Sequence, residues 1–238
     1  MEDSRRSRDV PLWRVARHRI HAGASDRINH AGSAPAVCVG SAIVASSPAI
    51  VHLVGFPAVG KYTIAKEVAQ LAERQGEHFV VIDNHHTNNV IFAALDVDGV
   101  RKLPPGVWDR VREVREALLR TIEELSPREW SFIFTNVLTE HDPGDAEVAD
   151  RLVSLAARRS SPYVPIRITC ETEELLRRVA NADRRERLKW IDPDGVRSYV
   201  GATQLISLGE HAPIDIDVTY LSPVEGARQI LRHVQGFG

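Results

Sequence analysis

One stretch of nine residues, GFPAVGKYT at positions 55–63, constrains this chain more than any other part of it. It follows the apolar run AIVHLV and precedes a segment whose apolar residues recur every three or four positions. These patterns are typical of a buried strand followed by an amphipathic helix. Glycines in a G-x-x-x-x-G-K spacing let the backbone curl, so that N–H groups and the positive helix end point inward. The sequence therefore predicts a strand–loop–helix unit that binds phosphate groups.

Strand and helix patterns alternate along the chain after this unit. The predicted strands cover 49–54, 79–82, 131–134, 164–169 and 214–219. The predicted helices cover 62–75, 107–125, 146–159, a charged stretch from 172 to 187, and 223–234. A polar loop is predicted at 84–89, directly after the second strand. Alternating strands and helices imply βαβ units and an α/β fold, with a parallel sheet that helices cover on both faces.

The first 47 residues differ in composition from the rest of the chain. They contain seven arginines, four acidic residues and no lysine, and they show no sustained helical or strand period. We therefore predict a poorly ordered extension over 1–47 and one domain over 48–238. The length of the second part fits a single domain.

Charge and composition argue against several classes of protein. The chain has 30 basic and 32 acidic residues, and this balance argues against a nucleic-acid binder, which needs a basic face. No apolar run approaches the roughly 20 residues that cross a bilayer, so no membrane partner is predicted. Cys38 and Cys170 lie far apart, which indicates neither a disulfide framework nor a zinc site. We expect a cytoplasmic monomer or homodimer.

The loop at 55–63 and the elements after it resemble the P-loop kinase group, which includes shikimate, gluconate and adenylate kinases. The resemblance covers residues 49–234. It implies a three-layer P-loop NTPase fold with a five-stranded parallel sheet in the order 2-3-1-4-5. It also implies ATP and Mg²⁺ as cofactors, an acceptor site beyond the second and third strands, and an Arg-bearing lid. The implied reaction moves the γ-phosphoryl group of ATP to a hydroxyl of a small molecule.

Two positions depart from the pattern of this group. Tyr62 stands where Ser or Thr usually contacts Mg²⁺, and Ala58 stands where Gly is usual. Thr63 comes one place later, as in adenylate kinase, where this Thr holds the α-phosphate and waters hold most of the metal. Lys61 is expected to reach the β- and γ-phosphates and to act in catalysis. The resemblance implies these nucleotide-binding residues: Gly55, Pro57, Ala58, Val59, Gly60, Lys61, Tyr62, Thr63 and Arg178.

Asp83 ends the second predicted strand, where shikimate-kinase-like enzymes carry an acid near Mg²⁺ and the acceptor hydroxyl. The resemblance makes Asp83 a catalytic residue and, together with Thr63, a metal-site residue. The alternative is a strand-end Asp that caps a turn, and it stays open. The third strand lacks the acid that adenylate kinase has at its end, which makes Asp83 more important. The candidate substrate-binding residues are Asn84, His85, Thr135 and Asn136.

Four arginines crowd the segment after the fourth strand: Arg178, Arg184, Arg185 and Arg187. Fixed positive charge suits a lid that closes over a transferring phosphoryl group. By the resemblance, the lid covers about 178–195, and Arg184 and Arg187 act in catalysis. Acidic residues are interspersed, so a solvated helix with ion pairs one turn apart is the alternative.

The predicted acceptor is a neutral molecule rich in hydroxyl groups, because residues 84–94 contain no Arg or Lys. Arg110, Arg112 and Arg115 on the following long helix leave an anionic acceptor open. Two alternatives therefore stand beside the small-molecule kinase. One is a nucleoside monophosphate kinase. The other is a nucleotide-binding switch or ATPase without an acceptor, for which we identify no water-activating residue.

Overall fold

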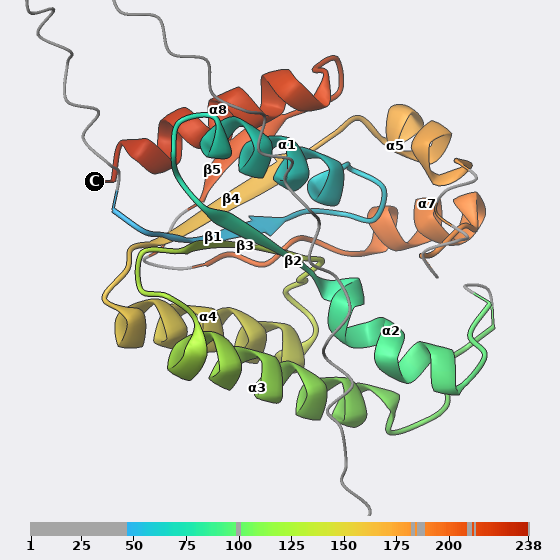
Figure 1. Cartoon of the computed structure of the whole chain (residues 1–238). Helices are drawn as coiled ribbons and strands as arrows, with labels where there is room; N and C mark the ends of the chain where they lie inside the picture. Colours follow the sequence, from blue (N-terminus) through green and yellow to red (C-terminus); the bar gives the residue numbers. More distant parts are fainter. Residues whose placement is uncertain are drawn as a thin grey trace, which may run out of the picture. The chain divides into compact units, whose positions relative to one another are not determined.

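Five parallel strands form one sheet in the order β2-β3-β1-β4-β5, which confirms the predicted order (Figure 1). The strands are β1 (Ile50–Val54), β2 (Phe79–Asp83), β3 (Ser131–Asn136), β4 (Tyr163–Thr169) and β5 (Ile214–Asp217). This computed structural model describes residues 47–98, 101–181, 184, 189–208, 211 and 213–237. The register aligns the ends of neighbouring strands, so that Val54 pairs with Asn136 and Asp83 pairs with Thr135. The ends of β1, β2 and β3 therefore meet at one edge of the sheet.

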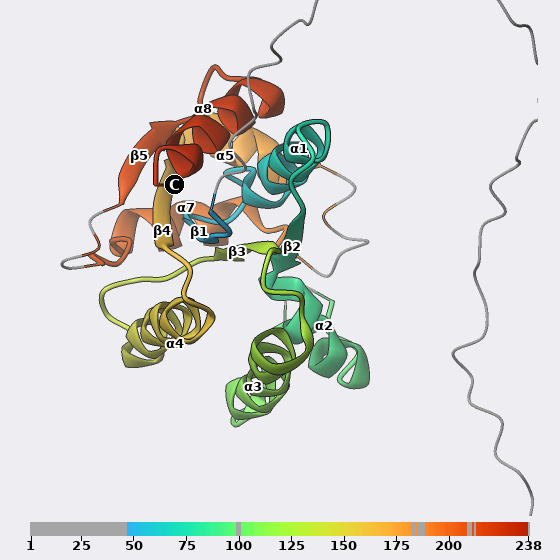
Figure 2. The same cartoon turned by 60° about the vertical axis from the view of Figure 1, so that its left-hand side comes forward.

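Helices cover both faces of the sheet, as the alternating pattern predicts (Figures 1 and 2). On one face lie α1 (Lys61–Glu73) and α8 (Pro223–Gln235), and on the other lie α3 (Val107–Leu125) and α4 (Pro143–Arg159). Side chains alternate along a strand, so β1 feeds both cores. Its Val51 and Leu53 pack with the α1 and α8 side, and Ile50 packs with the α3 and α4 side. This double burial explains the continuous apolar run that precedes the loop.

The polar loop predicted at 84–89 is wrong, because these residues begin a helix, α2 (Asn84–Ala94). Asp83 caps this helix, since its side chain accepts a hydrogen bond from the backbone N–H of His85. The other end of α2 is anchored by Phe92, which packs with Val107 and Val111 of α3. A good N-cap and tertiary packing thus outweigh the weak helix propensity of the polar residues.

The charged helix predicted from 172 to 187 is shorter in the structure. It ends at Val179 as α5 (Thr172–Val179), and a further helix that the sequence pattern did not predict, α7 (Pro193–Ala202), follows. The two helices pack together through Leu175, Val179 and Val196. Asp192 caps α7, and Pro193 occupies its first turn, which is a favourable helix start.

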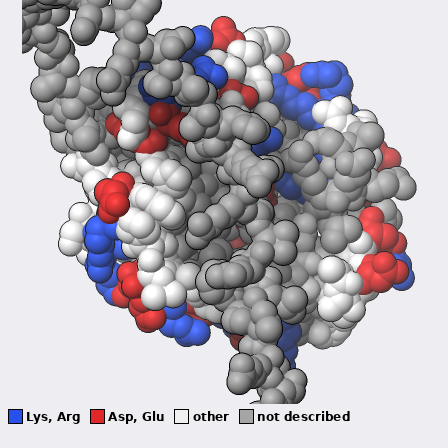
Figure 3. Space-filling model, viewed as in Figure 1, with Lys and Arg blue, Asp and Glu red and all other residues white. Residues whose placement is uncertain are grey.

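Several predictions lie wholly or partly outside the described residues. Residues 1–46, and Arg187 of the predicted lid, belong to this group, so the division at position 47 stays a prediction. No helix in the described part is both long and apolar enough to cross a membrane. On the face seen in Figure 3, the described basic and acidic side chains intermingle rather than forming separate patches.

Candidate active site

A cleft of about 1470 Å³ lies where the carboxyl ends of β1, β2 and β3 meet. In open α/β sheets, this edge is where ligands bind. The cleft brings together most of the predicted site residues from separate parts of the chain. Those that line it are Pro57, Ala58, Val59, Gly60, Lys61, Tyr62, Thr63, Asp83, Asn84, His85, Thr135, Asn136, Arg178 and Arg184.

The loop after β1 depends on two glycines for its shape. A Cβ atom on Gly55 would lie 2.5 Å from the carbonyl oxygen of Ile168, so that only glycine fits beside β4. Gly60 has a φ of 106°, in the left-handed region that favours glycine. Ala58 also has a positive φ, 67°, although its side chain disfavours this conformation. The loop therefore holds Ala58 in this conformation at some cost in backbone strain.

The N-terminus of α1 faces the cleft without a capping side chain. Its N-cap is Gly60, and its first turn contains no acidic residue. By contrast, α2, α4, α7 and α8 all begin with an Asp or Ser that accepts a backbone N–H. The helices α3 and α5 also lack a capping side chain, but each has at least one acidic residue in its first turn. The first N–H groups of a helix have no partner within it, and with the helix dipole they attract anions. This end of α1 is thus suited to phosphate.

Lys61, the first residue of α1, turns back onto its own loop. Its Nζ donates to the carbonyl oxygens of Gly55 at 2.6 Å and Phe56 at 2.9 Å, and the residue is 9% exposed. Burial lowers the pKa of Lys61 to about 7; Asp83 opposes this shift, and the nearby charges of Lys189 and Arg184 add to it. Lys61 is therefore only partly protonated near neutral pH, and a bound anion would stabilise its charged form.

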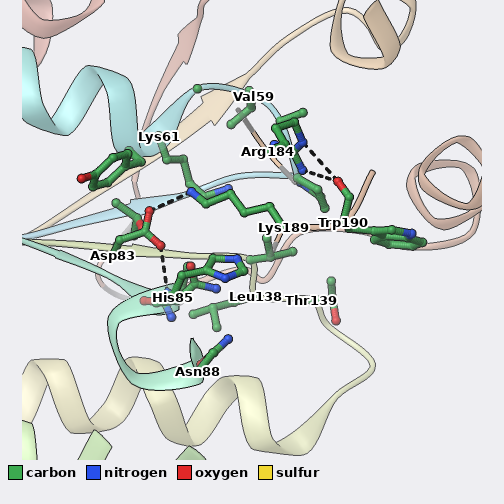
Figure 4. A pocket seen from close by; sticks show the side chains of 18 of the residues that line it. Val59, Lys61, Asp83, His85, Asn88, Leu138, Thr139, Arg184, Lys189 and Trp190 are labelled. Atoms are coloured by element: carbon green, nitrogen blue, oxygen red, sulfur yellow. Dashed lines mark hydrogen bonds and ion pairs between the residues drawn. The ribbon is translucent and has the colours of Figure 1, made fainter. Parts of the chain in front are cut away.

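Asp83 is paired with a lysine that the sequence analysis did not select. Its Oδ2 accepts a hydrogen bond from Nζ of Lys189 at 3.0 Å, and the side chains are 4% and 16% exposed. Figure 4 shows Lys61 and Lys189 reaching the region of Asp83 from different parts of the chain. Burial alone would raise the pKa of Asp83, but Lys189 and the His85 N–H outweigh it and the pKa is lowered. Asp83 thus both caps α2 and holds a cation.

Tyr62, which stands in the place of the usual Ser or Thr, has its ring near two lysine ammonium groups. Its ring lies 5.2 Å from Nζ of Lys66 and 5.0 Å from Nζ of Lys189, and its edge contacts His86. Within the described ranges, no group of three or more His, Cys, Asp or Glu side chains could hold a metal ion. The donor set therefore does not fit a resident metal. An Mg²⁺ ion that arrives with ATP has less need of protein ligands, because phosphates and waters fill most of its shell.

The end of β3 presents polar atoms to the cleft. The Oγ1 atom of Thr135 is buried and has no hydrogen-bond partner within the described part of the chain. Asn136 accepts a hydrogen bond at Oδ1 from Nε2 of His52, at 3.1 Å. Burial lowers the pKa of His85, on α2, to about 4, although the negative charge of Asp83 opposes this shift. These groups are uncharged at neutral pH and suited to hydroxyl groups.

Two predicted lid arginines hold backbone carbonyls in this structure. Arg178, on α5, donates to the oxygens of Val59 at 3.1 Å and Val218 at 3.0 Å, and so joins the phosphate loop to the end of β5. Arg184 donates to the carbonyl oxygen of Trp190 at 2.7 Å. Their roles toward a nucleotide remain predictions, as does the role of Arg187, which lies outside the described residues.

The far half of the cleft, between α2, α3 and α4, contains one arginine of special interest. Arg115, on α3, lines the cleft, and burial lowers its pKa while Asp145 and Glu116 oppose the shift. It forms no hydrogen bond or ion pair with any other described residue. By contrast, its neighbours Arg112 and Arg151 contact Glu147 at 3.6 Å and 2.6 Å. Arg115 is thus a partly buried cation that lines this half of the cleft.

Comparison with known proteins establishes the fold of this chain. The solved structures that resemble it include a candidate kinase from Chloroflexus aurantiacus, with 17% identity and a TM-score of 0.54 over 80% of this chain and 98% of that one. A gluconokinase from Sinorhizobium meliloti has 13% identity and a TM-score of 0.51 over 81% and 94%. The fold is that of P-loop NTPases.

A third structure, Kti12 of Chaetomium thermophilum in complex with ADP-AlF3, has 13% identity and a TM-score of 0.51 over 79% and 97% of the two chains. No protein-family model matches the chain, and no curated protein matches it in sequence. The expected likeness to P-loop kinases is confirmed for the fold, because kinases are prominent among the similar structures.

Proposed function

We propose that this protein is an ATP-dependent kinase that transfers the γ-phosphoryl group to a hydroxyl of a small molecule. The observation that carries the proposal is one shared cleft. The uncapped N-terminus of α1 and Lys61 lie in the same cleft as Asp83 and the polar end of β3. The helix N-terminus and Lys61 suit the phosphates of a nucleoside triphosphate. Asp83 and the end of β3 suit a hydroxyl acceptor. The likeness in fold to kinases supports this assignment.

In the proposed reaction, the acceptor oxygen attacks the γ-phosphorus in line. A bond forms between that oxygen and phosphorus, and the bond from phosphorus to the β–γ bridging oxygen breaks. Lys61 and the loop N–H groups hold the phosphates, and Thr63 holds the α-phosphate. Asp83 orients the hydroxyl and receives its proton as the new bond forms. Arg184 and Arg187 of the lid exclude water and offset charge on the phosphoryl oxygens.

ATP would bring Mg²⁺ as part of the substrate, and the ion would neutralise phosphate charge. Thr63 and Asp83 are the residues that we propose for its bound waters. Lys189 occupies Oδ2 of Asp83 in this structure. The ammonium of Lys189 therefore has to leave that oxygen before Asp83 can serve either a water or the acceptor.

An ADP-release screen with hydroxyl-bearing metabolites and antibiotics tests the proposal. We expect acceptor-dependent ADP release for the wild type and none for Lys61→Ala. Asp83→Asn is expected to reduce it by about 10²–10⁴-fold, the usual contribution of a positioned acid or base. Lys66→Ala is the matched control, because Lys66 is exposed on the same helix and does not line the cleft. Full activity in Lys61→Ala or Asp83→Asn would refute the assigned roles.

Arg115 favours a second candidate, in which the acceptor carries an anionic group. A nucleoside monophosphate kinase is the clearest example, because Arg binds phosphate through paired hydrogen bonds. Arg115→Gln should then raise the KM for an anionic acceptor by at least about tenfold and leave neutral acceptors unchanged. Arg112→Gln is the matched control, since Arg112 already pairs with Asp109 and Glu147. An equal effect of Arg115→Gln on neutral and anionic acceptors would eliminate this candidate.

The rival from another class is a nucleotide-binding switch or ATPase without an acceptor. It predicts slow ATP hydrolysis and no acceptor-dependent ADP release across the same panel. As part of the proposal we place the reaction in the cytoplasm and expect a monomer or homodimer. Two widely spaced cysteines are consistent with a reducing compartment.

A further inference from the structure

A histidine lies within the sheet among apolar strand residues. His52, in the middle of β1, is fully buried and lies on the same face of the strand as Ile50 and Val54. Those two residues pack in apolar clusters with residues of α3 and α4. Burial lowers the pKa of His52 to about 4, although its hydrogen bond to Asn136 opposes the shift. The imidazole is therefore neutral at pH 7, with one nitrogen that donates and one that accepts.

Both ring nitrogens of His52 have partners, and these lie on the two neighbouring strands. Nδ1 lies 2.8 Å from the hydroxyl oxygen of Tyr163 on β4, and Nε2 lies 3.1 Å from Oδ1 of Asn136 on β3. The three side chains thus form a continuous hydrogen-bonded chain across β4, β1 and β3. Of the three, Asn136 lines the cleft.

The hydroxyl of Tyr163 determines the direction of this chain. If it donates to Nδ1, then Nε2–H of His52 donates to Oδ1 of Asn136, and the amide NH₂ of Asn136 is left for the cleft. In the reverse arrangement, Nδ1–H would donate to the Tyr163 oxygen. Nε2 would then carry no proton to donate to Oδ1 of Asn136, the acceptor that faces it. The first arrangement keeps one more hydrogen bond and is favoured.

We propose that His52 and Tyr163 are positioning residues that hold Asn136 with its amide NH₂ turned toward the acceptor. This inference rests on the proposed function, because it makes Asn136 a ligand of the acceptor. An NH₂ group only donates, so it selects an acceptor oxygen with a free lone pair. In the proposed reaction, the proton of the same hydroxyl goes to Asp83. The amide of Asn136 and the carboxylate of Asp83 would therefore recognise a hydroxyl group together.

The first experiment needs no substrate, because it reads the tautomer of His52. Long-range ¹H–¹⁵N NMR spectra of the full-length protein show which ring nitrogen carries the proton. We expect the Nε2–H tautomer in the wild type and a mixture of tautomers in Tyr163→Phe. Tyr220→Phe is the matched control, because it removes an exposed hydroxyl that bonds to Glu171. An Nδ1–H tautomer in the wild type, or an unchanged Nε2–H tautomer in Tyr163→Phe, would overturn the proposal.

The second experiment measures the consequence for the acceptor, with the panel of the ADP-release screen as probe. We expect Tyr163→Phe to raise the KM of the acceptor by about tenfold and to leave the KM of ATP nearly unchanged. The melting temperature should fall modestly, because Nδ1 of the buried His52 loses its partner. Asn136→Asp should have a larger effect, because a carboxylate cannot donate to the acceptor oxygen. A change in kcat alone, or equal changes in both KM values, would overturn the positioning role.

The two experiments separate this inference from the function on which it rests. If the wild type shows no acceptor-dependent ADP release, the proposed function fails. The tautomer of His52 still decides the orientation of Asn136 in that case. If release is found but the Asn136→Asp variant retains the wild-type KM for the acceptor, the function stands and the inference fails.

Discussion

The ion pair between Lys189 and Asp83 allows a quantitative test of the site. Lys189→Met removes the ammonium group and keeps most of the apolar side chain. The two charges are 3.0 Å apart, which at an effective dielectric constant of about 20 corresponds to about 5.5 kcal/mol of attraction. Part of this attraction offsets the cost of removing both charges from water. We therefore expect the substitution to lower the free energy of unfolding by about 2–4 kcal/mol at pH 7.5.

The loss should depend on pH in a defined direction. In the wild type the pKa of Asp83 is lowered below its ordinary value of 3.8, so its ionised form stabilises the fold above that pH. Without Lys189, burial dominates and raises the pKa of Asp83 in the folded state. The folded variant then binds more protons than the unfolded chain just above pH 3.8, so its stability falls as pH rises through that window. The difference from the wild type should be small near pH 4 and complete at pH 7.5.

Urea unfolding followed by circular dichroism measures these differences. Asp83→Asn and the double variant Asp83→Asn/Lys189→Met complete a double-mutant cycle, and the double variant should recover part of the stability that Lys189→Met loses. We expect a coupling free energy of about 2–3 kcal/mol at pH 7.5 and equal slopes against urea. A coupling free energy below about 0.5 kcal/mol, or a loss in Lys189→Met that is the same at pH 4.5 and pH 7.5, would refute the reasoning.

Three further predictions concern the phosphate loop. Ala58→Gly relieves a left-handed φ of 67° and should raise the free energy of unfolding by up to about 1 kcal/mol in urea titrations. Gly55→Ala should destabilise the fold severely because its Cβ would lie 2.5 Å from a backbone oxygen, whereas Gly201→Ala meets nothing within 4 Å and should be nearly neutral by the same measurement. ATP binding at pH 8 should take up protons, because phosphate raises the pKa of Lys61 from about 7; calorimetry in buffers of different ionisation enthalpy measures this uptake, and Lys61→Met should reduce it.

The sequence predicted those parts of the site that depend on local geometry. The loop at 55–63 is identified by its own spacing, and the strand before it by a continuous apolar run, so both positions follow from neighbouring residues. The helix after β2 was mistaken for a loop because Thr87 and Asn88, which are buried, interrupt the apolar period. Its stability depends on the Asp83 cap and on packing against α3. Neither is visible as a periodic pattern.

The residues that sequence reasoning missed act through contacts between distant segments. Lys189 is 106 residues from Asp83, and His52 is 84 residues from Asn136. A lysine among the lid arginines and a histidine within an apolar strand were visible as exceptions in composition. Their partners were not, because pairing follows from strand order and from the path of the chain after α5. A residue that departs from its local sequence pattern is thus the signal by which Lys189 and His52 could have been selected.

The interactions within the cleft also predict that ATP and the acceptor strengthen each other's binding. Lys61 is held by two loop carbonyls, and Lys189 by the carboxylate of Asp83. A triphosphate is a stronger partner for both cations, since it carries more charge than either a carbonyl or one carboxylate. When Lys189 turns to the phosphates, Asp83 loses its cation and becomes available to the acceptor hydroxyl. Acceptor affinity should therefore rise when ATP or a non-hydrolysable analogue is bound, and by linkage the acceptor should tighten ATP binding by the same factor.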